Sequence, residues 1–132
     1  VHPHMRISLD WCFGLRASRQ TTVAYLDKPL VRKTRHGSNV SGNALRTAAS
    51  DVAVLEGILN DVSLTDSQRR HARIRASRRA ADAAYQEWSL NRDRRSARRW
   101  LFRSLSFDWY RGSVIMLCKT MIPLWIIKQL RG

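Results

Sequence analysis

The chain has 132 residues, a length that suits one domain and leaves little room for two. Hydrophobic residues make up 44% and charged residues 26%, a balance that excludes an intrinsically disordered chain. Lysine and arginine outnumber the acids by 24 to 10, and this net charge of +14 indicates an anionic partner: nucleic acid, a membrane face or a phosphorylated substrate. Cys12 and Cys118 lack metal-ligand spacing, which favours buried free thiols in a reducing, cytoplasmic compartment.

The first 42 residues are expected to combine one helix with extended segments. Apolar residues recur on one face of residues 9–18, which predicts a short helix. Residues 21–26 (TTVAYL) are β-branched and aromatic, so they predict a strand that ends at the turn residues 27–29. Residues 30–36 predict a second extended segment. Together the two segments predict a pair resembling a β-hairpin.

From Asn43 onward the pattern is helical. Asn43 is a suitable N-cap for a helix over about 43–60. Apolar residues in this stretch alternate at spacings of three and four, which predicts one apolar face; they are Leu45, Ala48, Val52, Leu55 and Leu59.

Thr65 and Gln68 have the spacing of a capping box at the start of a second helix. Small residues line one face of this helix and predict a close helix–helix approach; they are Ala72, Ala76, Ala80, Ala83 and Ala84. The pattern breaks near residues 91–93, and a third helix then carries Ala97, Leu101 and Leu105.

Residues 112–130 are mostly apolar, but Lys119 and Pro123 interrupt the run. A helix that spans a membrane needs roughly 20 mostly apolar residues. We therefore expect this segment to lie on a membrane rather than to cross it. The residues expected to contact the membrane are Trp109, Tyr110, Arg111, Trp125, Lys128 and Arg131.

Arginines are concentrated between residues 69 and 99, opposite the alanine face. Two readings stay open for this basic surface. It is either a solvated helix face or a surface that rests on anionic lipid, where each basic residue adds about 1 kcal/mol. Nucleic acid is not the expected partner, because the tryptophans are not interleaved as a stacking platform and no known DNA- or RNA-binding motif is visible.

Three ordered blocks between Ser8 and Ser41 resemble the end of the catalytic domain of family-2 glycosyltransferases, which are inverting enzymes of GT-A fold. The family has a helix reading roughly EDWDLWLRLA, then VAYLDEPLVRYR, then RxHxxNxS. The matching blocks here are Asp10-Trp11 with Leu15-Arg16-Ala17, then residues 25–31 (YLDKPLV), then residues 35–41 (RHGSNVS).

The resemblance implies a site. Asp10 takes the position of the general base that deprotonates the acceptor hydroxyl, and His36 takes a position that ligates the metal in some members. Mg²⁺ or Mn²⁺ would hold the departing diphosphate, and Arg32 or Arg35 would bind substrate by neutralising its charge.

The sequence thus predicts an α+β chain, mostly α: a remnant helix and β-hairpin of a GT-A domain in residues 1–42, and a helical extension in residues 43–132. No DxD motif, βαβ unit or glycine-rich phosphate loop is present. We therefore expect the nucleotide-binding half to lie in a longer parent protein, and the isolated chain to be inactive and without a cofactor.

The expected parent transfers a sugar from a nucleotide-sugar donor to a cell-surface glycan or lipid-linked acceptor. It would do so in the cytoplasm, as a peripheral protein on the inner face of a bacterial plasma membrane. The alternative is a basic helical module that docks on membranes or binds nucleic acid without catalysis.

Overall fold

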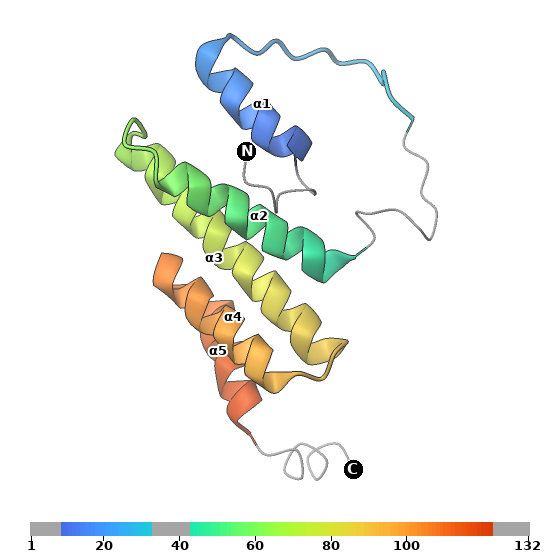
Figure 1. The fold of residues 1–132 in the computed structure, drawn as a ribbon, viewed down its shortest axis with the longest axis vertical. Coiled ribbons are helices and arrows are strands. Elements are labelled where there is room, and N and C mark those ends of the chain that lie inside the picture. Colours follow the sequence, from blue (N-terminus) through green and yellow to red (C-terminus); the bar gives the residue numbers. More distant parts are fainter. Residues whose placement is uncertain (1–8, 33–42, 123–132) are drawn as a thin grey trace.

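The structure, a computed structural model, describes residues 9–32 and 43–122. These residues form helices joined by short turns and one extended stretch (Figure 1). The helices are α1 (Leu9–Gln20), α2 (Ala44–Leu59), α3 (Asp66–Ser89), α4 (Arg94–Phe107) and α5 (Arg111–Met121).

The long helix α3 is the centre of the fold. Its main packing partners are α2 on one side and α4 on the other, and α5 packs chiefly on α4 (Figure 1). Helix α1 reaches this bundle through Trp11, which packs against the apolar cluster of Leu55, Ala72 and Ala76. The helices expected from the sequence are therefore confirmed, including the one at residues 9–18.

The expected β-hairpin is wrong. Within the described residues there is no strand: residues 22–32 are neither helical nor paired, and all of them are exposed to solvent. Strand geometry needs a partner, and an isolated two-stranded hairpin is at best marginally stable in water. The described part of the chain is all-α, which corrects the α+β assignment. The rest of the second predicted segment, residues 33–36, lies outside the described residues.

The alanine face of α3 is confirmed. Ala72, Ala76, Ala80, Ala83 and Ala84 are all buried. Because alanine has the smallest side chain compatible with good helix propensity, it lets α2 and α4 approach α3 closely on two sides. The packing of the bundle thus follows directly from where the sequence places its small residues.

Three helices begin at caps that satisfy their free backbone N–H groups. The Asn43 side chain accepts a hydrogen bond from the backbone N–H of Arg46. Thr65 and Gln68 form the predicted capping box, with each side chain accepting from the other's backbone N–H. These two sequence predictions are confirmed.

Asp93 caps α4 by accepting hydrogen bonds from the backbone N–H groups of Arg95 and Ser96. The hydrogen bond from Ser96 is the main cause that lowers the pKa of Asp93 below its ordinary value. A carboxylate with a lowered pKa stabilises the fold above its unfolded-state pKa. The cap's ionic contribution is therefore lost as the pH falls through the lowered value. The preceding turn is made by Arg92, whose φ of 56° is left-handed.

A hydrogen-bonded serine cluster lies between α3, α4 and α5. The Ser104 hydroxyl donates to the backbone oxygen of Ser77 at 2.7 Å, and its oxygen lies 2.6 Å from the Ser113 hydroxyl. All three serines are buried. The cluster satisfies its own polar groups, which buried hydroxyls require, and it fixes how the three helices meet.

Helix α5 covers the first part of the apolar segment 112–130. A Cβ at Gly112 would lie only 2.6 Å from a ring atom of Tyr110, so glycine here lets the tyrosine ring fold over the start of the helix. In the described part of the chain, no helix has the length and apolar character needed to cross a membrane. The remainder of the segment, from residue 123, lies outside the described residues.

Candidate functional site

Asp10, the candidate general base, lies in the first turn of α1 and is exposed. Its carboxylate accepts a hydrogen bond from the backbone N–H of Trp11 at 2.9 Å. The first turn places this carboxylate at the positive end of the helix. Trp11 turns toward the bundle, so Asp10 stands at the edge of the junction between α1 and the α2–α3 pair.

Of the other predicted site residues, the structure describes only Arg32. Arg32 is exposed at the end of the extended stretch, and Arg35 and His36 lie outside the described residues. In the part of the chain that is described, no three His, Cys, Asp or Glu side chains gather as a metal site would require.

The structure describes some of the predicted membrane-contact residues and not others. Trp109 and Tyr110 connect α4 to α5 and are exposed, Trp109 to 75%, and Arg111 beside them is exposed as well. Trp125, Lys128 and Arg131 lie outside the described residues. Cys118 is exposed rather than buried, which corrects that expectation, while Cys12 is half-buried.

Four arginines have a role that the sequence did not suggest. Each donates to backbone oxygens at the C-terminal end of a neighbouring helix, where the last carbonyls lack intrahelical partners and carry partial negative charge. Arg69 caps the end of α2 at Leu59, with an N–O distance of 2.7 Å, and Arg73 caps the end of α4 at Phe107.

The end of α5 receives two such arginines from α4. Arg98 donates to the backbone oxygen of Thr120 at 2.6 Å, and Arg94 donates to that of Ile122 at 2.8 Å. Part of the basic surplus therefore neutralises helix ends within the fold, although Arg73 stays exposed to solvent. The Arg69 cap joins residues 10 positions apart and the other three caps join residues 22 to 34 positions apart, and helix periodicity predicts none of these pairings.

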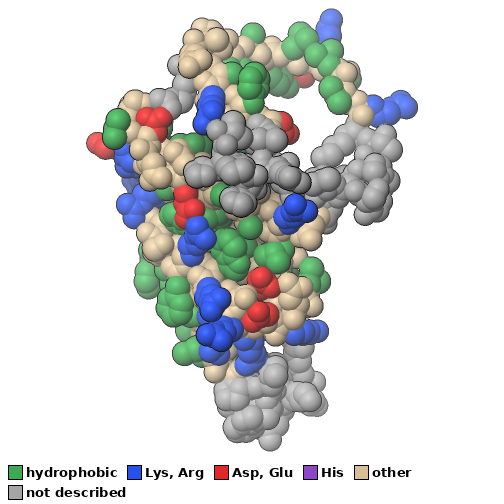
Figure 2. Space-filling model, viewed as in Figure 1, with side chains coloured by type: hydrophobic (Ala, Val, Ile, Leu, Met, Phe, Trp, Pro, Cys, Tyr) green, Lys and Arg blue, Asp and Glu red, His purple; other side chains and the backbone are tan. Residues whose placement is uncertain are grey.

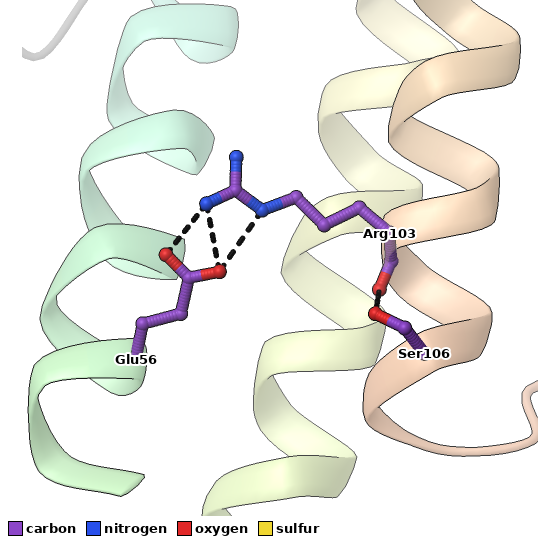
Figure 3. Close-up of polar contacts among 3 residues, drawn as sticks. All are labelled: Glu56, Arg103 and Ser106. Carbon is purple, nitrogen blue, oxygen red and sulfur yellow. Dashed lines mark hydrogen bonds and ion pairs between the residues drawn. The ribbon is translucent and has the colours of Figure 1, made fainter. Parts of the chain in front are cut away.

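Arg103 of α4 spans α3 to reach Glu56 of α2 (Figure 3). Two of its nitrogens bind the carboxylate at 2.6 to 2.9 Å, and its guanidinium lies 5.4 Å from the centre of the Trp100 ring. Bidentate geometry makes this the strongest ion pair among the described residues, although partial exposure keeps its contribution to about 1 kcal/mol or less.

A groove opens where α1, α2 and α3 meet. Its volume is about 550 Å³, within the range of small-molecule sites. Trp11 and Leu55 form an apolar wall. The charged residues that line it are Asp51, Arg75, Arg78, Arg79 and Asp82.

The remaining basic side chains are spread over the surface. Figure 2 shows Lys and Arg along the length of the bundle, with acidic side chains among them and, in its lower half, apolar side chains beside a group of basic ones. The chain does not present one continuous basic stripe on this face. Such a stripe is the usual footprint of a surface that follows a nucleic-acid backbone.

Comparisons with family models, with curated proteins and with solved structures find no match to this chain.

Proposed function

We propose that the chain is the C-terminal part of an inverting family-2 glycosyltransferase, which transfers a sugar from a nucleotide-sugar donor to a cell-surface glycan or lipid-linked acceptor. Residues 1–42 then end the catalytic domain, and residues 43–132 form a helical extension. The observation that carries the proposal is the order and spacing of the three motif blocks between Ser8 and Ser41. The helix that the first block requires is present as α1, with Asp10 in its first turn.

In the proposed reaction, the catalytic group that this chain supplies is Asp10, as the general base. In an inverting transfer one base removes the acceptor's proton as its oxygen attacks the anomeric carbon. Asp10 is exposed in the first turn of a helix, so an acceptor can reach the carboxylate. Arg32 and Arg35 supply positive charge for the diphosphate. Mg²⁺ or Mn²⁺, with His36 as a ligand, belongs to the same proposal for the parent protein.

Apolar side chains that are exposed on and after α1 support the proposal that another part of the parent protein packs against them. Phe13 on α1 and several large residues of the following stretch face solvent. Contiguous apolar surface usually marks a contact with other protein, and in the proposed parent the rest of the catalytic domain covers it. The exposed residues of the stretch are Val23, Tyr25, Leu26, Leu30 and Val31.

The substitution Asp10→Asn in the parent protein tests the base. We expect kcat to fall at least about a hundredfold, with the donor's Kd unchanged, because the amide keeps the shape of the carboxylate but cannot take a proton. The assay supplies a panel of nucleotide sugars and measures release of the nucleoside diphosphate.

Asp66→Asn is the matched control, because Asp66 is also a first-turn aspartate and is also exposed. It should leave kcat unchanged. Normal turnover by the Asp10 variant, or an equal loss in both variants, would remove Asp10 from the mechanism.

We also propose that α4 and α5 hold the protein on an anionic membrane surface, as a peripheral protein. Large apolar side chains are exposed along these helices beside Arg111 and Lys119, the combination that interfacial helices use. The apolar residues are Phe102, Trp109, Tyr110, Ile115 and Met121.

Flotation with vesicles of phosphatidylglycerol and phosphatidylcholine tests the docking. The chain should float with these vesicles, and the pair Trp109→Ser with Ile115→Ser should lose most of that binding. The pair Val23→Ser with Val62→Ser removes exposed apolar side chains elsewhere and should float as before. Equal loss in both pairs, or retention on DNA with no lipid binding, would contradict this docking mode.

A further inference from the structure

The groove between α1, α2 and α3 contains positive charge that the fold does not use. Arg79 is already ion-paired within the fold, since its guanidinium binds Asp51 at 3.1 Å and Asp82 at 3.2 Å. These two acids lie on either side of Arg79 and offset its charge. Arg75 and Arg78 line the same groove and make no hydrogen bond or ion pair with another described residue.

The unused arginines are placed to act together. Arg75 and Arg78 are three positions apart on α3, so they share a face with their Cβ atoms roughly 5–6 Å apart. A guanidinium presents parallel N–H donors that match two oxygens of one phosphate. Two neighbouring guanidinium groups therefore suit two linked phosphates better than one.

The rest of the groove is suited to the organic part of a ligand that also carries phosphate, which we call its body. Trp11 of α1 and Leu55 of α2 contribute apolar surface to its lining. A flat indole stacks on a base or a sugar ring and equally well packs against a lipid chain. The volume of about 550 Å³ accommodates a group of that size beside a diphosphate.

We propose that this groove binds the diphosphate group of an organic ligand, with Arg75 and Arg78 holding the two phosphates and Trp11 and Leu55 packing against the body. The described lining of the groove does not include Arg32, to which the proposed function assigns the donor. Because Asp10 precedes Trp11, the ligand is the acceptor of the transfer; this last step rests on the proposed function.

Titration calorimetry of the 132-residue chain with pyrophosphate tests the site. We expect the pair Arg75→Gln with Arg78→Gln to weaken pyrophosphate binding at least about tenfold. The pair Arg46→Gln with Arg95→Gln removes the same charge from exposed positions away from the groove and should change binding less than about twofold. Equal weakening by the two pairs would mean unspecific attraction to a basic protein and would overturn the proposal.

The choice of probe identifies the phosphate group and the body. Pyrophosphate should bind more tightly than orthophosphate, and equal affinity would overturn the diphosphate assignment. UDP and geranyl diphosphate represent the two sources. Tighter binding of geranyl diphosphate than of pyrophosphate supports a lipid-linked acceptor. Tighter binding of UDP would identify a nucleotide ligand and overturn the acceptor assignment, and no gain from either organic group would contradict the role of Trp11 and Leu55.

Two further measurements separate folding and function from binding. Thermal unfolding by circular dichroism should be unchanged in the glutamine pair, and the pair Arg75→Lys with Arg78→Lys should bind with intermediate affinity because it keeps the charge and loses the paired donors. Asp10→Asn should leave pyrophosphate binding unchanged. If Asp10→Asn abolishes sugar transfer but the wild-type chain does not bind pyrophosphate, this binding site alone is overturned. If the wild-type chain binds pyrophosphate but Asp10→Asn leaves sugar transfer unaffected, the role of Asp10 alone is overturned.

Discussion

Replacing Leu101 with alanine is expected to lower the free energy of unfolding by about 2–5 kcal/mol. Leu101 is fully buried on α4, the helix that packs against both α3 and α5. Its removal takes apolar atoms out of the core and leaves a cavity that three rigid helices cannot close.

Urea unfolding followed by circular dichroism measures this effect. Leu90→Ala is the control, because Leu90 lies in the turn after α3 and is 71% exposed. It should shift the free energy of unfolding by no more than about 0.5 kcal/mol. A Leu101 variant as stable as the Leu90 variant would contradict the packing of α4 described above.

Enlarging Ala76 to leucine is expected to destabilise the chain by about 1–3 kcal/mol, although leucine is more hydrophobic. Ala76 is fully buried on α3 and belongs to the cluster that contains Leu55 of α2. Three extra carbon atoms at this contact must push α2 away from α3. Because Trp11 packs on the same cluster, α1 should be displaced as well.

Ala44→Leu is the matched substitution at an exposed position of α2. It should leave the thermal midpoint nearly unchanged, whereas Ala76→Leu should lower it by several degrees, about 4–8 °C per kcal/mol for a domain of this order of size. An increase in stability on enlarging Ala76 would show that the helices are not in close contact there.

The helical part of the chain was predictable because its signals are local. Asn43 and the Thr65–Gln68 box act within one turn, and the alanine face follows from the 3.6-residue period alone. The start of α4 was predicted only as a break near residues 91–93. That Asp93 is its cap depends on the geometry of one side chain.

The strand prediction was wrong because strand formation depends on contacts that are not local in the sequence. The β-type composition of residues 21–26 describes what a segment prefers once it has neighbours. No described segment lies beside it, so the preference is not realised and its apolar side chains stay exposed. Strand formation depends on a partner that local sequence does not specify.

The candidate site shows the same division. The position of Asp10 near a helix N-terminus could be predicted from the sequence, because the first turn of the helix and the motif block occupy the same residues. The groove could not, since it joins Trp11 to residues on two other helices. Neither could the distinction between Arg79, which is paired, and its free neighbours Arg75 and Arg78.

The sequence by itself determined the helices, the caps at Asn43 and Thr65, the small residues between the helices and the large positive charge. Only the tertiary structure decided what that charge does. Arg69, Arg73, Arg94 and Arg98 neutralise the ends of other helices, while Arg75 and Arg78 remain unpaired beside Trp11. The reason is physical: helix periodicity acts over a few residues, but the partner of a charge is whatever the packing brings within about 3 Å of it.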